Sequence, residues 1–347
     1  MTASSRRGVL AASLLVFMAA APAWAIDYQA GEVNIDLILA ASAQAAHFKN
    51  GPDGESDSDG NFLGFARLNF EWVSDTGRVY GLRAEAQNGS RRSEALSADE
   101  IYAYFASELG RFELGRQDGA TDVMSFHAPI VALGQIRGDF SEYAGINASL
   151  SPSDTRDSPK LVYLSPPLHG IRFGVSYAPE FTVNKDSGDP RRRIVQKDAV
   201  EAATQYSQPL AGDWSLGVSA SLTRGNSDPQ TGRRDLSAWG TGVELRREEL
   251  VLGAAYVNNG DSNDATDVNE REWNAGIAWR GEKWGAAFSW ARNDSIPLDV
   301  TLLGVGGYYS INDYVVLRAD AVRVDERPRV GPSGSYTVVL FEIGVEL

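Results

Sequence analysis

The residues with the most evident chemistry are carboxylates gathered in one long stretch and arginines on two earlier segments. Residues 117–157 show no regular alternation and carry six acidic side chains: Asp118, Asp122, Asp139, Glu142, Asp154 and Asp157. Arg67 and Arg83 lie on the polar faces of two preceding segments. Carboxylates that face guanidinium groups across a narrow space create a strong transverse field, which sorts solutes by size and charge. The pattern therefore indicates a charge filter.

Catalytic and metal-binding chemistry has less support in the sequence. The three histidines, His47, His127 and His169, are scattered, and cysteine is absent, so no thiolate site or disulfide exists. Ser125 or Ser141 could act as a nucleophile with His127 as its base, but no nucleophile elbow surrounds them. We therefore expect no enzyme activity, no metal and no cofactor.

Other charged clusters admit two interpretations each. Asp53-Glu55-Asp57-Asp59 and Asp261-Asp264-Asp267 offer oxygen ligands for Ca²⁺ but lack the terminal glutamate of a twelve-residue calcium loop, so solvated loops are the simpler interpretation. Arg191-Arg192-Arg193, with Lys185 and Lys197, could contact lipopolysaccharide phosphates or simply be a soluble loop. A net charge of −14 argues against nucleic acid as a partner, because the phosphate backbone would be repelled.

The charged side chains require strands to position them. In residues 61–72, Phe62, Gly64, Ala66, Leu68, Phe70 and Trp72 fall on one face, and Leu63, Phe65, Arg67, Asn69 and Glu71 fall on the other. A period of two predicts a strand and not a helix. Further polar faces supply pore-lining candidates, so that the predicted set is Asn69, Glu71, Glu85, Arg172, Arg318 and Asp320.

About sixteen such stretches follow one another, and their connections alternate in length. Short links with turn residues occur at 75–77, 109–110, 166–170, 211–213, 280–282 and 311–313, and longer polar segments occur at 49–60, 180–198, 225–234 and 259–268. Short turns on one side and long loops on the other are typical of an outer-membrane barrel, whereas a soluble sandwich has no reason to sort them. We predict an all-β fold, a transmembrane antiparallel β-barrel of about sixteen strands.

The first residues have the composition of an export signal. Arg6 and Arg7 precede an apolar run at 9–21, and Ala23-Trp24-Ala25 forms a cleavage site. We expect a signal peptide at 1–25 and a barrel domain at 26–347, integral to a bacterial outer membrane. Ser5-Arg6-Arg7 also resembles a twin-arginine signal, but that route carries folded cargo, so the ordinary secretory route is favoured.

The long segment after the fifth strand is the candidate for narrowing the channel. A barrel of this size is too wide for side chains to fill, and about forty residues are too many for a passive hairpin loop. Apolar residues that could pin the segment to the wall are Val123, Met124, Phe126, Ile130, Val131 and Leu133. We therefore expect a third loop that folds inward.

With the run GRFELGRQDG at residues 110–119 leading into this loop, the chain resembles the general diffusion porins of Gram-negative bacteria, particularly the alphaproteobacterial branch. The resemblance implies homotrimers, a third loop folded into each barrel, and passive diffusion of ions and small hydrophilic solutes. The resemblance also implies a set of constriction residues, which we assign by their positions on the strands and in the loop. They are Arg67, Arg83, Asp118, Asp122, Asp139 and Glu142.

Two departures from that family leave the pairing within the constriction open. Enteric porins carry Pro-Glu-Phe-Gly-Gly at the loop tip, where residues 133–140 read LGQIRGDF. The family usually ends in phenylalanine, which the barrel assembly machinery reads, whereas this chain has Leu347.

The overall charge, −14 for the full chain and −16 once Arg6 and Arg7 leave with the signal peptide, favours cation preference, although lumen arginines oppose it locally. A solute-selective porin, or a closed barrel that acts as a structural or receptor protein, remains an alternative. The permeant solute and the pore radius do not follow from the sequence.

Overall fold

The computed structural model describes residues 26–49, 56–88, 97–184, 193–229, 232–262 and 267–347. The predicted signal peptide therefore lies outside the described residues, as do Asp53, Glu55 and Asp264 of the acidic clusters and Lys185, Arg191 and Arg192 of the basic segment. Among the described residues, no helix has the length and apolar character that crossing a membrane requires.

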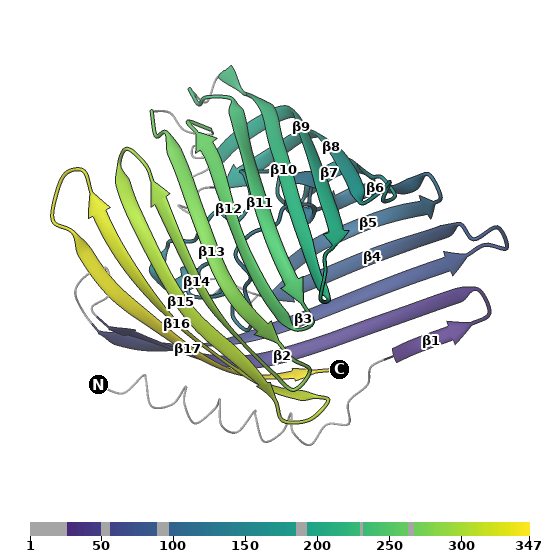
Figure 1. Cartoon of the computed structure of the whole chain (residues 1–347), viewed down its shortest axis with the longest axis horizontal. Coiled ribbons are helices and arrows are strands. Elements are labelled where there is room, and N and C mark those ends of the chain that lie inside the picture. Colours follow the sequence, from purple (N-terminus) through teal and green to yellow (C-terminus); the bar gives the residue numbers. More distant parts are fainter. Residues whose placement is uncertain (1–25, 50–55, 89–96, 185–192, 230–231, 263–266) are drawn as a thin grey trace.

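Sixteen antiparallel strands form a closed barrel (Figure 1). They are β2 (Val33–Lys49), β3 (Asp57–Val73), β4 (Val79–Asn88), β5 (Ser97–Ser107), β6 (Gly110–Gln117), β7 (Ser158–Leu164), β8 (Ile171–Asn184), β9 (Arg193–Pro209), β10 (Trp214–Ser227), β11 (Leu236–Arg247), β12 (Leu250–Gly260), β13 (Glu270–Arg280), β14 (Trp284–Asp294), β15 (Leu298–Ser310), β16 (Val315–Pro328) and β17 (Gly334–Glu346). Each strand pairs with the next, and β17 pairs with β2, where Phe341 lies opposite Ala45. The predicted barrel is confirmed.

One further strand was not predicted. β1 (Ile26–Ala30) folds back on the start of β2 as a short hairpin, with Ala30 opposite Val33. Gly31 has φ +60°, a conformation that glycine adopts readily and that a tight turn between the two strands uses.

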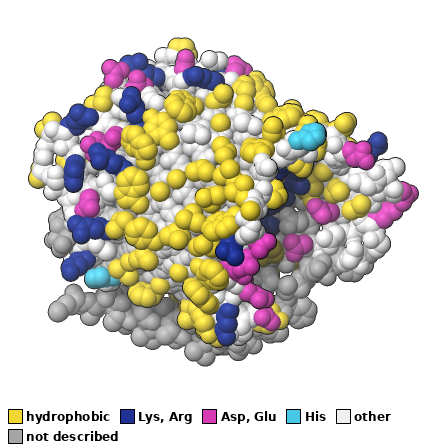
Figure 2. Space-filling view, in the orientation of Figure 1, with side chains coloured by type: hydrophobic (Ala, Val, Ile, Leu, Met, Phe, Trp, Pro, Cys, Tyr) yellow, Lys and Arg dark blue, Asp and Glu magenta, His cyan; other side chains and the backbone are white. Residues whose placement is uncertain are grey.

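Alternation along the strands separates an apolar outer face from a lumen face that is mostly polar and becomes apolar where the third loop packs against it. Phe288, Leu303, Val305 and Phe341 are 40–62% exposed although they are apolar. In Figure 2 such side chains gather over the middle of the outer face, with charged groups toward its edges. Because none of the described residues covers this face, it is suited to contact acyl chains.

Two rows of aromatic rings border this apolar face. Toward the long loops, Trp239, Tyr256 and Trp273 stand on three successive strands with centroids 5.4 and 5.2 Å apart. Toward the short turns, Trp72 stacks on Tyr80 at 5.2 Å, and Tyr80 contacts Phe105 at 5.1 Å. Aromatic rings prefer the level where hydrocarbon meets headgroups, so the two rows mark the membrane boundaries.

The third loop, L3 (residues 118–157), connects β6 to β7 and carries the two short helices α2 (Ala120–Val123) and α3 (Ser141–Ala144). Its apolar side chains pack with lumen-facing residues of β14–β17 and β2 into the largest core cluster, which includes Leu133, Ile136, Phe140, Val322 and Leu340. The loop therefore folds into the barrel, as predicted.

Candidate pore constriction

L3 is fastened along the inner wall by side chains of the strands. Its backbone N–H groups donate to a series of wall side chains: Phe126 to Ser219 Oγ (2.8 Å), Ala128 to Asn274 Oδ1 (2.8 Å), Gln135 to Asp320 Oδ2 (2.7 Å), Ser149 to Glu272 Oε1 (2.7 Å) and Ser153 to Asn259 Oδ1 (2.8 Å). L3 forms only part of its backbone hydrogen bonds internally, and the wall supplies further acceptors. L3 is thereby held in one position.

A single buried carboxylate joins the two ends of L3. Glu201 of β9 is fully buried and accepts hydrogen bonds from the N–H of Thr121 (3.1 Å), the N–H of Thr155 (2.9 Å) and the hydroxyl of Thr155 (2.5 Å). Glu201 therefore links the first and last parts of L3 through hydrogen bonds.

Glycines on the lumen face let the loop lie against the wall. A Cβ at Gly242 would overlap the Phe126 carbonyl oxygen, and one at Gly253 would overlap that of His127. At Gly304 it would come within 2.7 Å of the Gln135 Cβ. The wall under L3 is thus free of side chains at the points where the loop backbone crosses it.

The apolar residues that fix L3 differ in part from those predicted. Met124 and Leu133 are buried as expected, and Ile130 packs against the core cluster, but Val123 is 51% exposed. The main anchors are Ile136, Phe140 and Tyr143, which lie beyond the predicted stretch. The loop turns tightly at Gly134 and Gly138, so the residues after the turn fold back onto the wall.

A cavity of about 550 Å³ separates the end of L3 from the wall of β2, β3, β4, β16 and β17. We call it the tip cavity. Its charged lining comprises Asp139 and Glu142 from the loop and Arg318, Glu342 and Glu346 from the wall. Asp139 accepts a hydrogen bond from Gln44 Nε2 (2.6 Å), and burial raises the pKa of its carboxyl group. Arg318 pairs with Glu342 (2.7 Å) and with Glu346.

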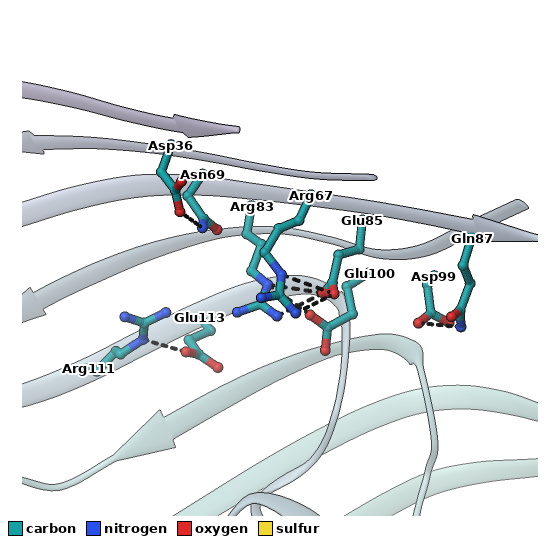
Figure 3. A network of polar contacts seen from close by, with 10 residues as sticks. All are labelled: Asp36, Arg67, Asn69, Arg83, Glu85, Gln87, Asp99, Glu100, Arg111 and Glu113. Atoms are coloured by element: carbon teal, nitrogen blue, oxygen red, sulfur yellow. Dashed lines mark hydrogen bonds and ion pairs between the residues drawn. The ribbon is translucent and has the colours of Figure 1, made fainter. Parts of the chain in front are cut away.

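The arginines of the early strands are paired with carboxylates on the same wall (Figure 3). Arg67 and Arg83 both contact Glu85, at 2.8 and 2.7 Å, and Arg83 also approaches Glu100 at 3.1 Å. Their side chains remain 30% and 27% exposed, while that of Glu85 is 6% exposed. Two guanidinium groups and two carboxylates thus balance each other along β3, β4 and β5.

A second paired group lies nearer the short turns on the same wall. Arg111 pairs with Glu113, as Figure 3 shows, and its guanidinium stands 3.8 Å from the centroid of the Tyr104 ring. The Tyr104 hydroxyl donates to Glu71, and Asn69 donates to Asp36 at 3.1 Å. Several of these side chains line a smaller cavity of about 240 Å³.

The base of L3 gathers a different set of acids. Asp118, Asp122, Asp154 and Asp157 line a cavity of about 580 Å³. One carboxylate oxygen from each of Glu100, Asp118 and Asp157 lies within 4.8 Å of the other two. Burial, then the charges of Asp122 and Asp157, raises the pKa of Asp118 to about 8, and burial with Asp122 raises that of Asp154 to about 6.

The family model described as Gram-negative porin matches residues 11–328. The chain belongs to the Gram-negative porin family. No curated protein matches the sequence.

Solved structures of porins share the fold of this porin. They include OmpF of Salmonella typhi in complex with daunomycin (TM-score 0.64, 14% identity, covering 93% of this chain and all of that one). The anion-selective porin of Comamonas acidovorans has a TM-score of 0.63 and 13% identity, and the match covers 91% of this chain and all of that one. The outer membrane channel DcaP of Acinetobacter baumannii has a TM-score of 0.63 and 13% identity, and the match covers 92% of this chain and 99% of that one. The protein is therefore an integral outer-membrane channel for passive diffusion.

The porin fold distributes the predicted site residues over three places. Asp139, Glu142 and Arg318 line the tip cavity, Asp118 and Asp122 line the cavity at the base of L3, and Arg67, Asn69, Glu71, Arg83 and Glu85 lie along the early-strand wall. Asp320 was predicted to line the pore, but it is 3% exposed and lies beneath L3, bound to Gln135. Arg172 is half-buried on β8, and its Nε has no hydrogen-bond partner among the described residues.

Several polar residues at these places were not predicted. Glu342 lies opposite Arg318 in the β16–β17 register, and Gln44 holds both Asp139 and the Tyr143 hydroxyl. Both lie on the lumen face in the alternation of their strands, so alternation could have identified them. Glu201 gave no such signal, because its role depends on two loop ends that only the fold brings together.

Proposed function

We propose that this porin conducts small hydrophilic solutes and ions with a preference for cations, and that the tip cavity sets this preference. The observation that supports the proposal is the charge of that lining, where Asp139, Glu142, Glu342 and Glu346 face the single guanidinium of Arg318. The arginines of the early-strand wall do not compensate, because Glu85, Glu100 and Glu113 already pair with them. An excess of fixed carboxylates raises the local cation concentration.

Removing the two loop carboxylates tests this proposal. The double variant Asp139→Asn with Glu142→Gln keeps the size of both side chains and should reduce the cation preference measured from reversal potentials across a salt gradient. Glu282→Gln is the matched control, because Glu282 is an exposed carboxylate on a short turn outside the lumen. An unchanged reversal potential in the double variant would remove Asp139 and Glu142 from the filter.

We further propose that the porin assembles as a homotrimer, which its family resemblance supports. In a planar bilayer, a trimer should add conductance in groups of three equal steps. Single, independent steps would favour a monomeric channel. No conductance at all would favour a closed barrel that binds partners through its loops.

A further inference from the structure

The tip cavity combines its charged groups with an apolar strip of the lumen wall. Its lining includes Ala40 on β2 and Leu63 and Phe65 on β3. Ala40 lies opposite Phe65 in the β2–β3 register, so the two side chains share a face. Gln44, four residues after Ala40 on the same face, contacts Asp139 of L3, which places this face in the lumen. The strip is therefore an apolar surface inside the channel.

The ring of Phe65 already interacts with one cation. It is half-buried, and the guanidinium carbon of Arg67 lies 5.0 Å from the ring centroid. Glu85 holds that guanidinium against the wall, as Figure 3 shows. The face of an aromatic ring attracts cations because its π electrons carry partial negative charge. Phe65 therefore offers both an apolar surface and a point of attraction for positive charge.

Two carboxylates of the cavity have no cationic partner. Within the described residues, neither Asp139 nor Glu142 of L3 forms an ion pair. The guanidinium in the lining, that of Arg318, is instead bound by Glu342 and Glu346. An ionised carboxylate has about four positions that accept a hydrogen bond. The L3 side of the cavity is thus suited to hold a positively charged group.

The two surfaces together distinguish organic cations from metal ions. A potassium ion has no apolar surface to remove from water, so the strip does not favour it. An ammonium group joined to an aromatic ring is favoured twice, because the carboxylates attract its charge and the strip covers its ring. The cavity volume of about 550 Å³ lies within the range typical of sites for small molecules.

We propose that the tip cavity holds small aromatic ammonium compounds on their way through the channel. The ammonium group contacts Asp139 and Glu142, and the aromatic ring lies against Leu63 and Phe65. This inference rests on the proposed cation preference and adds a class of solute to it. The affinity of the cavity for an ammonium ion then depends on the apolar part that the ion carries.

The test compares two permanently charged ammonium ions as blockers of the potassium current through the full-length protein in a planar bilayer. Benzyltrimethylammonium carries an aromatic ring, and tetramethylammonium does not. We expect the benzyl compound to interrupt the current at about fivefold lower concentration, because it adds contacts with Leu63 and Phe65. Block by the two ions at equal concentrations would overturn the proposal.

Two variants assign the difference to the apolar strip. Phe65→Gln keeps the charge of the wall but removes the ring, so the two ions should block at similar concentrations. Ile38→Gln is the matched control, since Ile38 is an apolar residue on the same lumen face, opposite Arg67, and does not line the cavity. The difference should persist in the control. Its persistence in Phe65→Gln, or its loss in both variants, would overturn the assignment, and potassium current through each variant verifies that it has folded.

Two further compounds separate the ammonium group from the ring. Benzyl alcohol has the ring without a charge, and benzenesulfonate has it with a negative charge, so neither should block the current. Block by benzyl alcohol at the concentration that suffices for benzyltrimethylammonium would contradict the role of the carboxylates. The reversal potential in potassium chloride is measured separately. A parent channel that prefers potassium but responds equally to both ammonium ions would therefore refute this inference and leave the proposed cation preference intact.

Discussion

At the scale of single residues, the charge that a solute meets depends on which ionic groups already have partners. Arg67 is paired with Glu85, which also holds Arg83, so removing one arginine changes the balance of the whole group. The group formed by Arg67, Arg83, Glu85 and Glu100 is balanced in charge only while both guanidinium groups are present.

Arg67→Ser should therefore increase cation preference and leave the barrel folded. Glu85 would keep one partner instead of two, which adds one uncompensated negative charge to the lumen wall. Reversal potentials measure the change, and Arg78→Ser, at an exposed turn position, is the control. An unchanged reversal potential would mean that Arg67 does not face the permeation path, and a shift toward anions would contradict the charge balance.

The acids at the base of L3 make the channel sensitive to pH. Because the pKa of Asp118 is raised to about 8, this group is protonated at neutral pH and becomes charged as the pH rises through 8. Cation preference should therefore increase between pH 7 and pH 9. In Asp118→Asn this increase should be smaller than in the parent, whereas the change near pH 6, which Asp154 contributes, should remain. Identical pH profiles for the variant and the parent would contradict this account.

At the scale of elements, the position of L3 depends on strands that offer glycine where the loop backbone crosses them. Gly242→Ala places a methyl group against the Phe126 carbonyl, so the loop must lift from the wall into the lumen. Single-channel conductance should fall. Gly334→Ala is the control, because a Cβ at Gly334 meets nothing within 4 Å. Equal conductance in both variants would show that L3 does not depend on this contact.

The strands could be predicted from the sequence, while the path of L3 could not. The strands follow a period of two that each segment carries in its own residues, as residues 61–72 illustrate. The loop follows contacts between distant residues, such as Gln135 with Asp320 and Thr155 with Glu201. The same limit explains why Asp320 was assigned to the open pore: alternation correctly placed it on the lumen face but contained no information on what covers that face.

At the scale of the whole molecule, the apolar outer face must contact lipid. Phe288, 47% exposed, lies between the two aromatic rows, so Phe288→Arg puts a charge into hydrocarbon at a cost of about 2–4 kcal/mol near the midplane. The variant should unfold at lower denaturant concentration in lipid vesicles than the parent, while Phe288→Leu should not. Equal stability of the arginine variant would show that the face is assigned incorrectly.

The complete barrel joins three features into one account: a lipid-facing exterior, a loop fastened inside, and an excess of carboxylates beside that loop. The most direct test is the reversal potential of the purified protein in a planar bilayer under a potassium chloride gradient. We expect open channels whose reversal potential lies toward that of potassium. A reversal potential toward that of chloride would contradict the proposed filter, and a bilayer without conductance would contradict the channel itself.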